Sequence, residues 1–351
     1  MVVMVTESGV GMSIAERPGG NALAATCGSG EFANDEYRRP RDFRESLLLV
    51  LATLWLLDAV LQIQRCMFTP GSSGLSGMLN SMARGNPSWI AHTVTWNASM
   101  VYHQPVLTNT FFALIQFLIA FGIVSKRTRK PALALSIAWA LGVWWFGEGL
   151  GELLSGGATP FRGSPGAVLF YALLAVLLWP SEGSDGPFVA ARTVGLNAAR
   201  IIWVAVWAVM ALLAVAGSGR SPRVLHDLVA GMNSGQPGWL AAVDRCVESL
   251  FLHHASPLAI SLAIVCFVVA IGVILPPALT RATLALAVVV FAIIWVATQN
   301  FGGILAGGAT DPNSGPLVIV LALTYWPLTD TRGTSSAVAS GPVVAATEAD
   351  R

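Results

Sequence analysis

The sequence predicts an all-α, polytopic integral membrane protein, for two reasons: its composition and a stretch that occurs twice. Hydrophobic residues make up 54% of the 351 residues, charged residues only 11%, and the mean hydropathy is +0.66. A soluble domain carries about 25% charged residues. With so little charge, most of the chain is expected to lie in a lipid bilayer, which is the first partner predicted for it.

The repeated stretch contains the run Gly-Gly-Ala-Thr in both copies. The first copy is WWFGEGLGELLSGGATP (144–160) and the second is WVATQNFGGILAGGATDP (295–312). Upstream of these, five residues recur at a constant spacing: Met82, Pro87, Trp89, Ser99 and His103 correspond to Met232, Pro237, Trp239, Ser249 and His253. Self-similarity at a fixed period indicates a duplicated structural unit.

Eight apolar runs predict about eight transmembrane helices, arranged as two tandem four-helix repeats. A bilayer core of about 30 Å requires ~20 helical residues. The last run of each half is shorter, so it is expected either to begin inside the preceding Gly/Pro loop or to lie in a thinned part of the bilayer. The runs are 46–65, 108–125, 131–153, 166–180, 200–217, 257–275, 278–298 and 316–328.

The predicted domain organisation follows from these runs. Repeat 1 covers 46–181 and repeat 2 covers 200–328, joined by a cytoplasmic linker at 182–199. The tails at 1–45 and 329–351 are rich in small and polar residues, so they are expected to be disordered. The N-terminal tail lacks the apolar segment of a secretory signal.

The distribution of Lys and Arg predicts the orientation. Fourteen of the 20 basic residues fall on the side of the N-terminus, including the SKRTRK turn (125–130) between the second and third runs. The positive-inside rule then places both termini in the cytoplasm. The predicted location of the protein is the cell (plasma) membrane. Because each half has an even number of spans, the halves are parallel, related by an axis along the membrane normal.

An amphipathic helix is expected on the outer face of each half, between its first two spans. In the first half, five residues follow one another at steps of three and four and so form one helical stripe: Trp89, His92, Trp96, Met100 and His103. Trp and Met on such a stripe favour a helix that lies at the membrane interface. Its counterpart is 239–254.

The paired histidines His103 and His253 are the first candidate ligand-binding residues. Each precedes the second span of its half, so a pseudo-twofold axis would bring them together at the outer face. Imidazoles placed in this way suit haem, a metal or a quinone carbonyl. The alternative is that they anchor the interfacial helix. His92 is a further candidate, either in packing or in a soft copper site with three methionines, Met78, Met82 and Met100.

The carboxyl groups are the second set of candidates. Glu148 and Glu152 are four residues apart near the end of the third run, which places them on one helical face, where like charges repel. Protonation, a cation or Arg162 would compensate that repulsion, and the alternative is a helix end in water. Asp58 lies within the first run, where an acid is a functional candidate by default, unless it pairs with Arg65.

The sequence lacks several catalytic motifs. No GxSxG, HExxH, CxxC or P-loop is present, so hydrolase, zincin, thioredoxin-like and NTPase activities lack support. An enzymatic activity is not favoured, and the motifs identify neither a cofactor nor a metal. No basic patch with interleaved aromatic residues suggests nucleic acid. Cys66 and Cys246 either form a disulfide between the halves or remain free. The Gly-Gly pairs 156–157 and 307–308 are expected to end the third helix of each half.

One region resembles a known family. The run from Gln116 to Trp145, with Gly122 before the basic turn 126–130, is similar to the DoxX-like group of small four-helix membrane proteins, and Gly272 repeats the pattern in the second half. The resemblance implies a tandem duplication of a DoxX-like unit and an association with redox enzymes, as in the quinone-linked members. Gln116 replaces the acid that is frequent in the family, so no catalytic residue carries over.

Three functions therefore compete. The first is an accessory, redox-associated subunit with a quinone, haem or metal site between the repeats at the outer face, and with a membrane or periplasmic redox partner. The second is a transporter of a small solute or of protons that uses the intramembrane carboxyl groups. The third is a structural assembly partner without a ligand.

Overall fold

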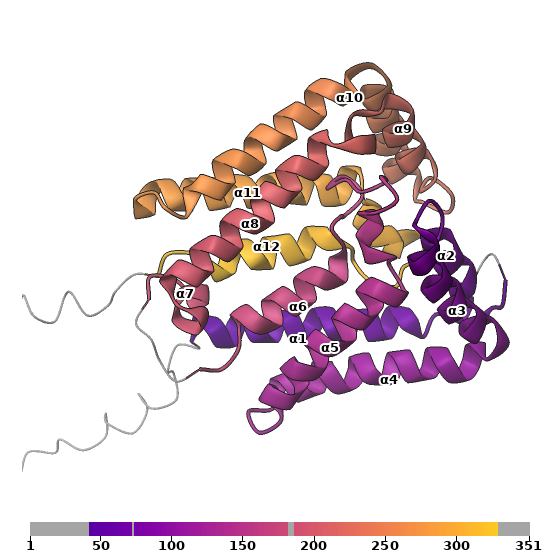
Figure 1. Cartoon of the computed structure of the whole chain (residues 1–351), viewed down its shortest axis with the longest axis horizontal. Helices are drawn as coiled ribbons and strands as arrows, with labels where there is room; N and C mark the ends of the chain where they lie inside the picture. The colour runs from indigo at the N-terminus through magenta and orange to yellow at the C-terminus, as the bar shows by residue number, and fades with distance from the viewer. Residues whose placement is uncertain (1–41, 72–73, 182–185, 329–351) are drawn as a thin grey trace, which may run out of the picture. The chain divides into compact units, whose positions relative to one another are not determined.

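The computed structural model describes residues 42–71, 74–181 and 186–328, which contain helices and no strand, so the predicted all-α class is confirmed (Figure 1). The predicted tails lie almost wholly outside these residues. The first half contains α1 (Phe43–Gln62), α2 (Leu75–Met82), α3 (Ser88–His103), α4 (Pro105–Val124), α5 (Arg129–Phe146) and α6 (Ala167–Leu177). The second contains α8 (Leu196–Val215), α9 (Pro222–Ala230), α10 (Gly238–Gly272), α11 (Pro277–Ala297) and α12 (Ser314–Thr324).

Within the described residues, five helices are long and apolar enough to cross a membrane, namely α1, α4, α8, α10 and α11 with the turn that follows it. The chain is therefore a multi-pass membrane protein. The helices α6 and α12 are apolar but have 11 residues each, or about 16 Å at 1.5 Å per residue. The expected linker contains a short helix, α7 (Val189–Val194).

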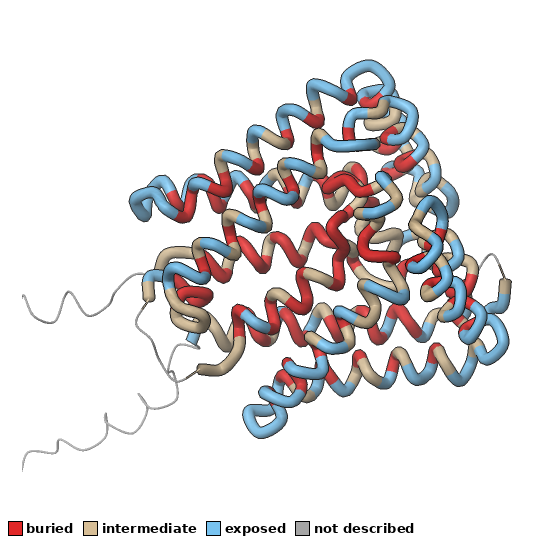
Figure 2. Tube along the Cα trace, in the orientation of Figure 1, coloured by how far each residue is buried: buried red, intermediate tan, exposed pale blue. Residues whose placement is uncertain are grey.

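The two short helices lie at the centre. α12 packs against α6 and α1, and so joins the two halves, while α4 packs on α1 and α10 on α8. Figure 2 shows α6 and α12 largely buried, whereas the longer helices α4, α10 and α11 expose one side. The exposed side of α4 is apolar and matches a lipid-facing surface, with Val106, Leu107, Phe111, Leu114, Leu118 and Phe121.

The connecting helices separate the two ends of the bundle. α2, α3 and α9 gather at one end, and the beginning of α1 lies with α7 at the other (Figure 1). At that second end Arg129 pairs with Glu45 through two hydrogen bonds of 2.7 and 2.9 Å. A bidentate pair of this kind is a strong, directional contact, and it fastens α1 to the turn between α4 and α5.

Gly122, which carries the family resemblance, has a steric function at the same turn. A Cβ atom at this position would lie 2.6 Å from the Cβ of Ala132, so only glycine lets α4 and α5 approach this closely. Gly272 similarly faces Thr283 between α10 and α11.

The predicted amphipathic helix of the first half is α3. Its buried face is Ile90, Val94, Ala98 and Val101. The predicted Trp, His and Met stripe is exposed, although its two tryptophans also make ring contacts with Trp145 and Phe146 at the end of α5. In the second half the corresponding helix is continuous with the following span in α10. The joint is marked by His254, with φ −133° and ψ 21°, and by Pro257.

The prediction that the Gly-Gly pairs end the third helices is wrong for the α-helices themselves, although Gly307 caps the short 3₁₀ segment Asn300–Ala306 that follows α11. α5 already ends at Phe146 and α11 at Ala297. Each is followed by four residues with positive φ, from +54° to +63° at 149–152 and from +48° to +82° at 300–303. The chain thus makes a left-handed turn, which costs non-glycine residues about 1–2 kcal/mol each.

A tryptophan and a glycine hold each left-handed turn against the loop that follows it. The indole of Trp144 donates to the carbonyl oxygen of Pro165 at 2.7 Å, and Trp295 donates to that of Pro312 at 2.6 Å. Any Cβ at Gly151 would lie 1.9 Å from the same Pro165 oxygen. Close backbone contact, which only glycine permits, therefore explains the repeated Trp and Gly.

We predict that Gly302→Ala destabilises the protein far more than Gly303→Ala. Both positions have strongly positive φ, +72° and +82°, but a Cβ at Gly302 would lie 2.4 Å from the Asp311 carbonyl oxygen, whereas Gly303 has open space. The conformational cost of about 1 kcal/mol is shared, and the clash adds ~2 kcal/mol. The apparent Tm in detergent is expected to be about 5 °C lower for Gly302→Ala than for Gly303→Ala; equal Tm values would contradict the close contact.

Candidate functional site

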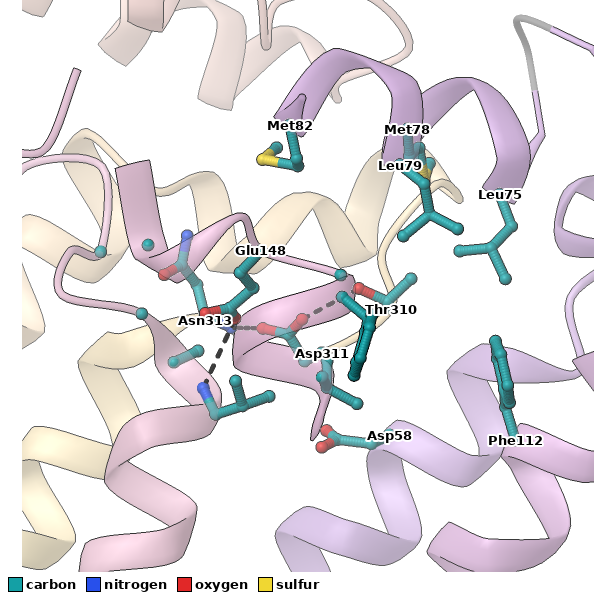
Figure 3. Close-up of a pocket in the computed structure, with 18 of the residues that line it drawn as sticks. Asp58, Leu75, Met78, Leu79, Met82, Phe112, Glu148, Thr310, Asp311 and Asn313 are labelled. Carbon is teal, nitrogen blue, oxygen red and sulfur yellow. Dashed lines mark hydrogen bonds between the residues drawn. The ribbon is translucent and has the colours of Figure 1, made fainter. Parts of the chain in front are cut away.

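A cavity of about 550 Å³ lies between α1, α2, α4, α5 and the loops that precede α6 and α12 (Figure 3). Its volume is in the range of small-molecule sites. Most of its wall is apolar or aromatic, with Trp55, Leu75, Met78, Leu79, Met82, Trp96, Phe112, Trp139 and Phe146. Four carboxyl groups also line it, those of Asp58, Glu148, Glu152 and Asp311.

Asp58 reaches the cavity from α1, where its side chain is 2% exposed. Its Oδ1 has no hydrogen-bond partner among the described residues. The hydroxyl of Tyr171 lies near this carboxyl group without the geometry of a hydrogen bond. The alternative that Asp58 pairs with Arg65 is not found in the described ion pairs.

Glu148 lies in the loop directly after α5 and caps α6. Its Oε1 accepts a long hydrogen bond, 3.5 Å, from the backbone N–H of Val168 in the first turn of that helix, where such donors lack partners within the helix. Gln299 has the corresponding function in the second half, because its Oε1 accepts from the backbone N–H of Gly315 at 3.1 Å. A neutral amide thus caps the short helix of the second half at the position that the carboxyl group of Glu148 occupies in the first half, so the capping does not require a charge.

The surroundings raise the pKa of Glu148 to about 8. The largest cause is burial, followed by the charge of Asp311. Part of the Glu148 side chain is accessible, although the residue lies inside the protein. The accessible part therefore faces the internal cavity and not the outside of the protein. At neutral pH the group is therefore mainly protonated.

Asp311 comes from the loop before α12, in the second half, and its charge acts on both Asp58 and Glu148. Its carboxylate accepts hydrogen bonds from the Thr310 hydroxyl at 2.9 Å and from the Asn313 backbone N–H at 2.7 Å. Burial nevertheless raises its pKa above the usual value. Figure 3 shows the three carboxyl groups facing the cavity, with side chains of α2 across from them.

Sequence reasoning missed Asp311, although a signal was present. The first copy of the stretch reads Gly-Gly-Ala-Thr-Pro and the second Gly-Gly-Ala-Thr-Asp-Pro, so the two loops differ from this point on. The tryptophan hydrogen bonds match Pro312 with Pro165, which places Asp311 where the first half has Ser164. An acid that departs from an otherwise matching pattern marks a position with a specific function.

The prediction that Glu148 and Glu152 share a helical face is wrong, because α5 ends before both and the chain turns left-handed between them. Their charges are compensated separately. Glu152 pairs with Arg162 at 2.9 and 3.0 Å, as one sequence hypothesis expected. A hollow of about 410 Å³ shares Glu152 and Arg162 with the cavity, so this ion pair lies on the boundary between the two spaces.

Four buried polar atoms that line the cavity have no hydrogen-bond partner among the described residues. They are Asp58 Oδ1, Gln116 Oε1, Trp139 Nε1 and Glu148 Oε2. Buried polar atoms nearly always have a partner, and leaving one unsatisfied costs about 1–3 kcal/mol. Their concentration around one cavity indicates that a polar ligand or water occupies it. Gln116, singled out by the family resemblance, is one of the four.

The predicted histidines lie elsewhere. His92, His103 and His253 are exposed and do not line the cavity. The ring contacts described for His103 and His253 are with their sequence neighbours, Tyr102 and His254. The proposed copper set is divided, because Met78 and Met82 line the cavity while His92 and Met100 are exposed on α3. Among the described residues, no group of three or more His, Cys, Asp or Glu forms a metal site.

The cysteines of the possible disulfide, Cys66 and Cys246, are both free in the structure. Cys66 instead donates to the carbonyl oxygen of Gly307 at 3.2 Å, which adds a contact between the first half and the loop before α12.

We predict that Glu148→Gln weakens the dependence of stability on pH. Because burial raises the pKa of Glu148 from 4.5 to about 8, its contribution to stability is full below about pH 4.5 and is lost as the pH rises through 8. The wild-type apparent Tm is therefore expected to fall between pH 7 and pH 9, and to fall less in Glu148→Gln, which keeps a cap like that of Gln299. Equal slopes for the two proteins would contradict a protonated Glu148.

Comparisons with known proteins leave the family of this chain open. No family model matches the sequence, and no curated protein or solved structure is significantly similar to it.

Proposed function

We propose that this protein is a membrane carrier that binds a small amphiphilic cation in the cavity and exchanges it for protons. The observation that carries the proposal is the set of three neighbouring carboxyl groups, Asp58, Glu148 and Asp311, in an enclosed and otherwise apolar cavity. Arg162, the basic residue among those lining it, is already paired with Glu152.

The exchange follows from electrostatics. Carboxyl groups that share a buried site cannot all be ionised, since each raises the pKa of the others. In the empty cavity the site therefore binds protons, and Glu148, whose pKa is about 8, is a group that holds one at neutral pH. An organic cation stabilises their ionised forms and displaces those protons, while Trp55, Trp96 and Trp139 offer aromatic surfaces for its apolar part and for cation–π contacts.

The proposal includes the arrangement expected from the sequence: eight spans in two parallel four-helix repeats, with both termini cytoplasmic in the plasma membrane. It is supported by the matching contacts of the halves, such as the two Trp-to-Pro hydrogen bonds and the two left-handed turns. In this arrangement α6 and α12 each complete a span together with the preceding loop, whose polar backbone is tolerated because it lines a cavity.

A redox-associated role is the second candidate. The free N–H of Trp139 and the aromatic wall would suit a quinone ring, whose carbonyl oxygens accept hydrogen bonds. In this second candidate the protein is the accessory subunit expected from the sequence, but its quinone binds in the cavity and not at His103 and His253. Its partner would be a membrane redox enzyme.

Binding of tetraphenylphosphonium, an aromatic cation, tests the carrier proposal. Equilibrium binding to the purified full-length protein is expected to strengthen as the pH rises from 6 to 8.5, because the carboxyl groups ionise. Asp58→Asn should weaken binding at least about tenfold, the worth of one charge-assisted contact. Asp227→Asn, which changes an exposed acid on α9, is the matched control. The proposal would be rejected if the affinity for tetraphenylphosphonium changed neither with pH nor with the substitution of Asp58.

Extraction of the gently purified protein separates the two candidates. A quinone recovered in stoichiometric amount from wild type, and lost when Trp139→Phe removes the indole N–H, is the result expected for a redox-associated subunit. Protein without quinone that drives tetraphenylphosphonium flux in proteoliposomes under an imposed pH gradient is the result expected for the carrier.

A further inference from the structure

A second polar cluster lies in the second half, outside the cavity. It joins α10, the loop after α9 and the left-handed turn after α11. Asn300 donates from Nδ2 to Asp244 Oδ2 at 3.1 Å, and Asn233 donates from Nδ2 to Glu248 Oε1. Asp244 and Glu248 are four residues apart on α10, hence on one face of that helix. The cluster thus contains two carboxyl groups and two amides.

The fold does not require polar side chains at these positions. The matching residues of the first half are Ala83, Val94 and Ala98, 150 positions earlier, and Gly149, 151 positions earlier. Ala83 and Val94 belong to a small apolar cluster, and Ala98 is fully buried. All four positions therefore bear oxygen-containing side chains in the second half alone.

Several of these oxygen atoms have no partner. Asp244 and Asn300 are 0% exposed, yet Asp244 Oδ1, Asn300 Oδ1 and Asn233 Oδ1 make no hydrogen bond within the described part of the chain. The charge of Arg245 acts on Asp244, but no ion pair between them is described. Asp244 is thus a buried carboxylate with one unsatisfied oxygen, and the charge of the half-buried Glu248 acts on it. Such an arrangement is costly to bury without a cation.

We propose that Asp244, Glu248, Asn233 and Asn300 form a calcium site. Carboxylate and amide oxygens are the ligands that Ca²⁺ prefers, and it accepts six to eight of them in irregular geometry. Two carboxylates balance its charge, and the absence of sulfur or imidazole from the cluster disfavours zinc and copper. The ion stabilises the junction of α10 with the loop after α9 and the turn after α11. The site is independent of the cavity and of the carrier proposal.

Calcium titration of the purified, chelator-treated full-length protein tests the site. The apparent Tm is expected to rise saturably with CaCl₂, with half-saturation at about 10⁻⁴–10⁻³ M, the range of extracellular calcium modules. At a hundredfold excess the rise should be about 5 °C. KCl at matched ionic strength should not reproduce it; an equal rise in KCl would show charge screening and overturn the proposal.

Two variants replace a residue of the cluster with the residue at the matching position of the first half. Asp244→Val copies Val94 and removes a carboxylate, and Asn300→Gly copies Gly149 at a position whose φ of +48° suits glycine. Both should abolish the calcium-dependent rise, and Asn300→Gly should keep the calcium-free Tm within a few degrees. The control Asp227→Asn should keep the full rise. A wild-type rise retained in Asn300→Gly and Asp244→Val would overturn the assignment.

Discussion

Two indole-to-carbonyl hydrogen bonds, from Trp144 to Pro165 and from Trp295 to Pro312, organise the centre of this protein. They hold the loops after α5 and α11 inside the bundle, where irregular backbone needs internal partners. The loops supply those partners to each other: Thr298 donates to the Phe161 carbonyl oxygen and Asn313 to that of Arg162. These directional hydrogen bonds add to the apolar packing of α12 on α6 and α1, which joins the two halves.

The same constraint creates the candidate site. Because the loops occupy space that full-length helices would fill, α6 and α12 are short and a cavity remains beside them. The loops also bring Glu148 and Asp311, which are far apart in sequence, to the cavity that Asp58 lines from α1. Their proximity in an apolar enclosure turns ordinary acids into groups whose protonation responds to whatever binds there.

The sequence predicted the elements better than it predicted their ends. Strong apolar runs located α1, α4, α8, α10 and α11, because burial in lipid demands a long hydrophobic segment. It failed at α5, where apolar character continues past Phe146 although the helix does not. The hydropathy of a segment does not indicate whether its backbone is left-handed. In this segment only the glycines at 149 and 151 indicated such a turn. Among site residues, Asp58 was anticipated as a lone acid and Glu148 as one of a pair with Glu152, whereas the candidate histidines His92, His103 and His253 proved to be exposed.

By itself the sequence determined the class of the protein, since composition decides whether a chain dissolves in water or in lipid. It also shows that the Gly-Gly-Ala-Thr stretch occurs twice and where acids interrupt the apolar segments. Only the tertiary structure decided which acids meet, that Glu152 is neutralised by Arg162, and that Asp311 completes the group from the other half. Proximity of residues more than 150 positions apart depends on how the helices pack, and no local pattern encodes it.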